Sequence, residues 1–167
     1  MITYLEMLKE ADSLMSIQLR TLTEEGRPYV AYLYGGDGRV ITEAYIRQLA
    51  ASYPVHYKPL DIDALVRHAK GAHALDCSQL IVGLSDAPND MSSGALISVC
   101  EYTTTPEKGV EGSLRWKPGH VGLDLGKGYC LEMVGEFRDL QINKISGRGF
   151  TRSGRLPWVD YTGASDK

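Results

Sequence analysis

The stretch HVGLDLGKGYCLEMV, residues 120–134, decides how we expect the second half of this 167-residue chain to fold. Its odd positions are mainly large apolar residues, and its even positions include His120, Cys130 and Glu132. Period-two alternation sends the two sets to opposite faces of a sheet. If a turn of odd length around GKG joins two strands, His120 and Glu132 share one face; an even-length turn would separate them. The ordinary alternative is that both are solvated positions on the exposed face of a half-buried sheet.

The sequence around this hairpin also favours strands. SLRW, DLQINKI and LPWVDY are short β-rich runs separated by Gly or Pro, and they predict an antiparallel sheet. Residues 85–112 are rich in Ser, Thr, Pro and Gly, which predicts loops at the rim of a cleft around a short strand at ALISVCEY, residues 95–102. The sheet is therefore expected to occupy the C-terminal part of the chain.

The first half of the chain is predicted to be helical. Thr42 can cap a helix that Pro54 stops, and a further helix begins near Asp61. Helices first and strands second indicate an α+β protein, and the length suits a single domain over residues 1–167. An amphipathic helix within residues 1–26 is expected to pack on it through four residues at helical spacing, Leu5, Leu8, Met15 and Leu19.

Charge and cysteine content exclude several classes of protein. With 18 Lys and Arg against 21 Asp and Glu, the formal charge of -3 offers no basic surface for nucleic acid and no polybasic segment for a membrane. We expect the acidic N-terminal stretch not to be a secretory signal peptide, because it has no unbroken apolar run, and no apolar run in the sequence is long enough to span a bilayer. Three widely spaced cysteines form a poor disulfide framework and suit a reducing compartment, with at least one free thiol.

Cys77 lies in GAHALDCSQLIVG, residues 71–83, where a helix is expected to begin. Asp76 or Ser78 can cap this helix. Unpaired backbone N–H groups and the helix dipole at such a position stabilise a thiolate, and a nearby imidazolium stabilises it further. A thiolate, a histidine and a third polar group that orients the ring together catalyse acyl transfer, and the backbone N–H of Cys77 could receive the oxyanion. The alternative is a small buried hydrophobe, which is our interpretation of Cys100. Cys130 is expected to face the cleft without a role.

Two other kinds of site are weighed and not favoured. His68, His73 and Cys77 lie close together in the sequence, but their spacing matches no usual zinc pattern and no CxxC occurs. The loop GGDG, residues 35–38, lacks both phosphate-binding spacings. We therefore expect no metal and no cofactor.

Three separate motifs resemble the NlpC-type papain-like cysteine peptidases, which cut peptidoglycan stem peptides. LDCSQLIV is similar to the family's nucleophile motif, PGHVGLDLGKGYCLEM to its histidine motif, and YLYGG, residues 32–36, to its aromatic-Gly-Gly motif. GFTRSGRLPWVDY is similar to the closing strand of phage and prophage members. The resemblance covers residues 29–161 and implies a papain-like fold whose nucleophile opens a helix.

The resemblance also implies a role for individual residues. It makes Cys77 the nucleophile, His120 the general base and acid, and Glu132 the residue that orients the ring. It places Tyr32 and Tyr34 along the substrate cleft. Asp76 and Ser78 flank the thiol, and each could contact the substrate's free amine or carboxylate or serve only as a helix cap.

The chain departs from the family pattern at three positions. The family commonly has His, Asn or Gln where this chain has Glu132, whose negative charge would stabilise the imidazolium and make His120 a poorer acid. Gln79 stands where the family usually has Gly, and its bulk narrows the space beside the nucleophile. Ser113 replaces an acidic residue that is common in the strand before the histidine motif.

The sequence therefore predicts a cysteine endopeptidase that hydrolyses an amide bond in peptidoglycan stem peptides, next to D-glutamyl, through an acyl-enzyme at Cys77. Its partner is the wall peptide, and its oligomeric state is left open. Without a signal peptide it would stay in the cytoplasm of the producing cell or reach the cell wall during lysis, as a phage lysin or a recycling enzyme. The alternatives are transamidation on the same residues, and a peptidoglycan-binding or phage structural module that has lost turnover.

Overall fold

The computed structural model describes residues 1–105 and 109–164, and for residues 102–104 the backbone alone. The protein is α+β, with helices and antiparallel sheets, as predicted. The chain divides into two compact units: unit 1 is residues 1–13, 77–132 and 141–167, and unit 2 is residues 14–76 and 133–140. The single domain expected over residues 1–167 stays a prediction. Among the described residues, no helix is both long enough and apolar enough to cross a membrane.

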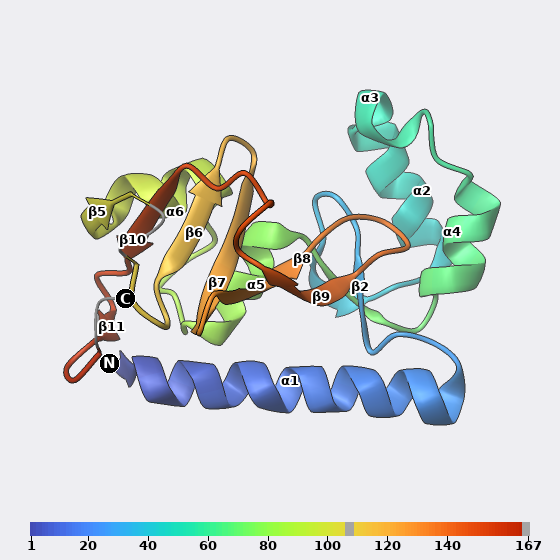
Figure 1. The fold of residues 1–167 in the computed structure, drawn as a ribbon. Coiled ribbons are helices and arrows are strands. Elements are labelled where there is room, and N and C mark those ends of the chain that lie inside the picture. Colours follow the sequence, from blue (N-terminus) through green and yellow to red (C-terminus); the bar gives the residue numbers. More distant parts are fainter. Residues whose placement is uncertain (106–108, 165–167) are drawn as a thin grey trace. The chain divides into compact units, whose positions relative to one another are not determined.

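Unit 1 is built on a six-stranded sheet (Figure 1). The runs SLRW, HVGLDL, YCLEM and LQINK form strands as predicted, whereas LPWVDY contributes only a two-residue strand, β11. An additional strand, β10, pairs antiparallel with both β5 and β6. The strands lie in the order β5 (Glu101–Thr104), β10 (Arg152–Arg155), β6 (Leu114–Lys117), β7 (His120–Gly126), β8 (Tyr129–Met133) and β9 (Leu140–Lys144).

The hairpin β7–β8 has the register that places even positions on one face. Leu123 pairs with Leu131 and Asp124 pairs with Cys130, so residues of equal parity face each other. The register shifts between Asp124 and Gly126, where the chain enters its turn. The expectation of a shared face is confirmed. The alternative of a solvated face is wrong, because Asp124 and Glu132 are both buried.

Two helices of unit 1 pack on this sheet. Helix α5 (Cys77–Leu84) lies against β7 and α6, and helix α6 (Ser93–Val99) lies against β6. The expected strand at residues 95–102 is therefore wrong over most of its length, and only β5 begins within it. The β-branched residues suggested a strand, but the Ser92 hydroxyl caps a helix at the Ala95 N–H, 3.2 Å away, and Leu96 becomes buried.

Helix α1 (Tyr4–Glu25) forms where the sequence predicts it, with Tyr4–Ser13 in unit 1 and the rest in unit 2. Its buried face is displaced by one residue from the expected one, because Leu5 and Leu19 are exposed and Tyr4, Met7, Ala11, Gln18 and Thr21 are buried. Gln18 is buried because its amide donates to the Val30 carbonyl and accepts from the Val30 N–H. Strand β1 (Ile2–Thr3) pairs in parallel with β11 (Val159–Asp160).

Unit 2 combines the C-terminal part of α1 and three further helices with a small sheet (Figure 1). Helices α2 (Glu43–Ser52), α3 (Pro54–Tyr57) and α4 (Ile62–Ala69) accompany strands β2 (Val30–Tyr32), β4 (His73–Leu75) and β3 (Asp37–Val40), which lie in the order β2-β4-β3. The predicted cap at Thr42 is confirmed, since Thr42 accepts from the Tyr45 N–H, and the helix predicted to begin near Asp61 is capped by Asp61, which accepts from the Ala64 N–H. The core consists of Ala31, Leu33, Ile41, Tyr45, Ile46, Leu49, Tyr57, Leu65, Ala69, Ala72 and Ala74.

Candidate active site

His120, the first residue of β7, is held by a buried carboxylate. Its Nε2 lies 2.6 Å from Oε1 of Glu132 on β8, and the Glu132 side chain has no exposed surface. An ionised carboxylate only accepts hydrogen bonds, so Nε2 is the donor. In the neutral ring, Nδ1 is then the nitrogen that can take up a proton. The hairpin therefore fixes both the orientation and the tautomer of the imidazole.

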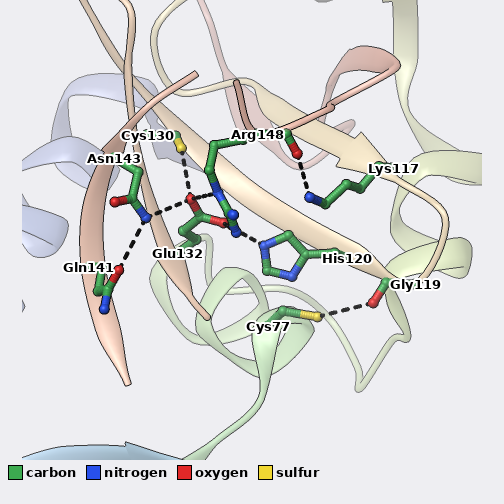
Figure 2. A network of polar contacts seen from close by, with 9 residues as sticks. All are labelled: Cys77, Lys117, Gly119, His120, Cys130, Glu132, Gln141, Asn143 and Arg148. Atoms are coloured by element: carbon green, nitrogen blue, oxygen red, sulfur yellow. Dashed lines mark hydrogen bonds and ion pairs between the residues drawn. The ribbon is translucent and has the colours of Figure 1, made fainter. Parts of the chain in front are cut away.

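Glu132 has three further partners besides His120, all within unit 1 (Figure 2). Arg148 forms a bidentate pair with it: Nη2 lies 2.8 Å from Oε1, and Nε lies 2.8 Å from Oε2. The amide of Asn143 on β9 donates to Oε2 at 3.0 Å, and the Cys130 thiol donates to the same oxygen at 3.4 Å. Each carboxylate oxygen thus accepts at least two hydrogen bonds, which fixes its position beside the imidazole.

The pKa of Glu132 shows which of its surroundings dominates. Burial by itself raises the pKa of this carboxyl, because a charge is costly away from water. The hydrogen bonds from His120, Arg148 and Asn143 outweigh burial and hold the pKa of Glu132 well below its usual range. In return, the hydrogen bond to Glu132 raises the pKa of Arg148. Glu132 is therefore a carboxylate whose charge is matched by a guanidinium.

The segment between β9 and β10 carries Arg148 to this position. Gly147 and Gly149 flank it with φ values of 86° and 75°, a backbone region that favours glycine. The Arg148 N–H donates to the Ile145 carbonyl at 3.2 Å, and the Lys117 ammonium donates to the Arg148 carbonyl. Sequence reasoning missed Arg148 and Asn143. The motif GRG at residues 147–149 is the one signal for Arg148, as an arginine in a glycine turn.

Cys77 is the first residue of α5, which packs on β7. Its Sγ lies 3.9 Å from the carbonyl oxygen of Gly119, the residue before His120. Figure 2 shows the imidazole of His120 between Glu132 and Cys77, with its second nitrogen on the side of the thiol. Cys77 is buried, with 7% of its residue surface exposed. The thiol and the histidine thus lie at one place in unit 1.

Aromatic and small residues complete the surroundings of His120. The Phe150 ring stacks on the imidazole with centroids 6.0 Å apart and an interplanar angle of 18°. The Lys117 ammonium lies 5.4 Å from the centre of the Phe150 ring. A Cβ on Gly122 would lie 3.3 Å from the Leu131 carbonyl oxygen and 3.4 Å from the Phe150 ring. Glycine at position 122 therefore leaves room for the stack beside the hairpin.

The other two cysteines have different surroundings. Burial raises the pKa of Cys100 to about 12, and burial together with the nearby Glu132 carboxylate raises the pKa of Cys130 to about 12. All three cysteines are free thiols. Cys130 has no exposed surface, so the expectation that it faces a cleft is wrong. Cys100, expected to be a small buried hydrophobe, is half-buried, and its raised pKa is that of an unreactive thiol.

The four predicted substrate-binding residues are divided between the units. Ser78 is buried in α5 of unit 1, whereas Tyr32, Tyr34 and Asp76 belong to unit 2. The Tyr32 N–H donates to Asp139 at 2.8 Å, and the Tyr34 N–H donates to Glu136 at 3.0 Å. The Tyr34 ring is 42% exposed and stacks on His56. Their roles toward substrate stay predictions.

The residues of the metal alternative have other partners. His68 Nε2 lies 2.7 Å from Asp139 Oδ2, and His73 Nδ1 lies 3.2 Å from the Gly38 carbonyl oxygen. Within residues 1–105 and 109–164, no three His, Cys, Asp or Glu side chains are grouped to hold a metal ion.

The site therefore presents a thiol at a helix N-terminus together with a histidine whose tautomer a buried carboxylate fixes. This set of groups suits nucleophilic attack by sulfur with proton transfer through the imidazole.

Comparison with known proteins adds one structural similarity. No family model matches the chain, and no curated protein matches it. The structure is similar to that of RipB, a peptidoglycan hydrolase from Mycobacterium tuberculosis, with 19% sequence identity and a TM-score of 0.43. The match covers 86% of this chain and 81% of that one.

Proposed function

We propose that the protein is a cysteine endopeptidase that hydrolyses an amide bond of peptidoglycan stem peptides, next to D-glutamyl. One observation carries the chemistry: the imidazole of His120, held by buried Glu132, lies between that carboxylate and Cys77 at the start of α5. The three motifs that resemble NlpC-type peptidases support the substrate class and a papain-like arrangement. The resemblance of residues 149–161 to phage members supports a role in lysis.

The proposed reaction uses these groups in a fixed order. Nδ1 of His120 takes the proton of the Cys77 thiol, and the thiolate adds to the amide carbon of the substrate. The Cys77 N–H at the helix N-terminus stabilises the resulting oxyanion. The C–N bond then breaks as His120 gives its proton to the departing amine, which leaves a thioester on Cys77. Water, deprotonated by His120, hydrolyses the thioester and restores the thiol.

Mass spectrometry of peptides released from purified peptidoglycan tests this proposal. The wild-type protein should release peptides with new carboxyl and amino ends, and Cys77→Ala should release none. Cys100→Ala is the matched control, because Cys100 is a half-buried thiol at the end of another helix, α6, and the variant should keep its activity. Undiminished release by Cys77→Ala would refute the nucleophile assignment. The masses also name the bond that is cut.

The same assay separates the rival functions. A binding or structural module would sediment with peptidoglycan without releasing peptides. A transamidase would give products that carry an added amine in place of a new carboxyl end. Gln79 supports the binding alternative, because its side chain adds bulk two residues after Cys77 in α5. The Gln79 amide lies 3.4 Å from the Asp90 carboxylate. The charge of Glu132, which by itself would make His120 a poorer acid and so favour a module without turnover, is matched by Arg148.

A further inference from the structure

Glu132 poses an electrostatic problem for the proposed peptidase. A lone carboxylate against an imidazole favours the imidazolium, and a histidine that holds its proton too tightly is a poor acid for the departing amine. A neutral group at this position, such as an amide, would orient the ring without this cost. Glu132 is also completely buried, where an unmatched charge is expensive. Something in the structure has to offset the carboxylate.

Arg148 meets both requirements at once. Its guanidinium contacts both Glu132 oxygens at 2.8 Å, while Nε2 of His120 occupies the remaining side of Oε1 at 2.6 Å. The pair together carries no net charge, yet it still offers an acceptor to the imidazole. Such a bidentate contact has a fixed geometry, which a lysine ammonium would not reproduce fully.

The other groups around the carboxylate do not supply this positive charge. Asn143 from β9 donates a neutral amide to Glu132, and Gln141 accepts from Asn143 in turn. Cys130 from β8 contributes a thiol whose pKa is raised to about 12 by burial. Lys117 from β6 directs its ammonium to the Arg148 carbonyl, and Arg115 from β6 pairs with Asp124 of β7.

We propose that Arg148 is a positioning residue for the Cys77–His120 pair: its guanidinium neutralises Glu132 and fixes it against Nε2, so that a carboxylate acts as a neutral orienting group. This inference rests on the proposed function for its catalytic meaning. Arg148 itself reaches the reaction only through Glu132.

Alkylation of Cys77 at varied pH tests this role without any wall substrate. Iodoacetate carries a negative charge, which the imidazolium attracts, whereas iodoacetamide is uncharged. The rate of alkylation by iodoacetate, divided by the rate with iodoacetamide, therefore falls as the pH rises and His120 loses its proton. This fall is the limb of the pH profile that reports on His120. Mass spectrometry of the Cys77 peptide gives both rates for each variant.

The variants should move this limb of the pH profile in opposite directions. Arg148→Gln leaves the carboxylate unmatched and should move the limb to higher pH by about one unit, because an unscreened opposite charge favours the imidazolium. Glu132→Gln leaves the guanidinium unmatched and should move it to lower pH. The double variant Glu132→Gln with Arg148→Gln should return the limb close to its wild-type position. Arg148→Lys keeps the charge and should restore most of the profile.

The outcomes separate this inference from the proposed function. If every variant keeps the wild-type limb and loses rate equally at all pH values, Arg148 is structural only, and the proposal is overturned while the peptidase stands. If the limbs move as expected but wild-type protein releases no wall peptides, the proposed function fails and the role of Arg148 is upheld. A wild-type Cys77 that labels no faster than Cys100 would overturn both. Glu132→Gln and the double variant bury no unmatched carboxylate, so they keep the test valid if Arg148→Gln folds poorly.

Discussion

The pairs His120–Glu132 in unit 1 and His68–Asp139 in unit 2 have similar geometry and different electrostatics; unit 2 also holds the pair His56–Glu136, at 2.9 Å. His120 and Glu132 in unit 1 lie 2.6 Å apart, and His68 and Asp139 in unit 2 lie 2.7 Å apart. Both carboxylates are buried, with side-chain exposures of 0% and 8%. Yet the pKa of Glu132 is held well below its usual range, whereas burial raises the pKa of Asp139.

The further partners of each carboxylate account for this difference. Glu132 has the guanidinium of Arg148 and the Asn143 amide, while Asp139 has the Tyr32 N–H in addition to His68. At Asp139, burial outweighs the hydrogen bonds and the nearby Glu136 carboxylate also raises the pKa, whereas at Glu132 the hydrogen bonds from His120, Arg148 and Asn143 together outweigh burial. A short contact between a histidine and a carboxylate therefore does not by itself define a catalytic pair. The further partners of each carboxylate set the direction of its pKa.

Removing each histidine in turn should give the largest difference between the two pairs, measured as the alkylation rate of Cys77. His120→Ala should slow the alkylation of Cys77 by iodoacetamide at pH 7 about a hundredfold, the scale of a lost proton-transfer partner. His68→Ala is the matched control and should leave the rate nearly unchanged. Labelling followed by mass spectrometry of the Cys77 peptide gives both rates. Equal slowing in the two variants would remove the functional distinction between the pairs.

Removing the partner of each carboxylate should separate the two pairs in stability. Arg148→Met leaves Glu132 buried and unmatched, and should lower the free energy of unfolding by about 3 kcal/mol. His68→Gln can keep a hydrogen bond to Asp139 and should cost about 1 kcal/mol. Urea titration at pH 7 measures both values. A loss for Arg148→Met no larger than that for His68→Gln would show that Arg148 does not offset the buried charge.

When each carboxylate is neutralised, the change in stability relative to wild type should follow opposite trends with pH at the two pairs. The lowered pKa of Glu132 means that its contribution to stability is present above the ordinary glutamate value of about 4.3 and is lost as the pH falls through the lowered value. The penalty of Glu132→Gln should therefore shrink on acidification. The raised pKa of Asp139 means that wild type loses stability as the pH rises through it.

The free energy of unfolding of Asp139→Asn, relative to that of wild type, should consequently be higher at pH 7 than at pH 3. At neutral pH the variant should stay within about 1 kcal/mol of wild type. Urea titrations of both variants at several pH values between these limits check the two trends. Parallel pH trends in the two variants would contradict the electrostatic difference between the pairs.

The smallest change in the alkylation rate of Cys77 is expected when Cys130 is substituted. Its thiol donates to Glu132, but Arg148 and Asn143 continue to hold the carboxylate when that bond is lost. Cys130→Ala should change the alkylation rate of Cys77 less than about threefold. In the wild-type protein, Cys130 should resist iodoacetamide at pH 8, because burial raises its pKa to about 12. Labelling of Cys130 at the rate of Cys77 would show that its surroundings open in solution.

Periodicity predicted those parts of the fold in which local pattern and tertiary packing agree. The alternation in residues 120–134 gave the β7–β8 hairpin and its common face, and Thr42 and Asp61 gave two helix starts. The pattern failed at residues 95–99, where a capped helix formed despite β-branched residues. It also misplaced the buried face of α1, because Gln18 is buried to bond the backbone at Val30.

In the candidate site, too, local pattern predicted some residues, and others are brought in only by tertiary packing. The spacing of His120 and Glu132 was readable because strand register converts sequence distance into spatial distance. Nothing comparable pointed to Arg148, which lies in a glycine turn 16 residues from Glu132 and has no periodic relation to the hairpin. Asn143 was missed because an alternating strand shows which residues share a face and not which of them donates to a neighbour.

The sequence by itself indicated the α+β class, the alternation that allows His120 and Glu132 to share a face, and Cys77 as the candidate nucleophile, whereas the strand register settled the shared face. The sequence could do so because alternation and helix-capping signals act over a few residues. Only the tertiary structure decided that Glu132 is buried, ionised and matched by Arg148. Burial and charge compensation depend on side chains brought together from β7, β8, β9 and the turn before β10, and this proximity has no local signature in the chain.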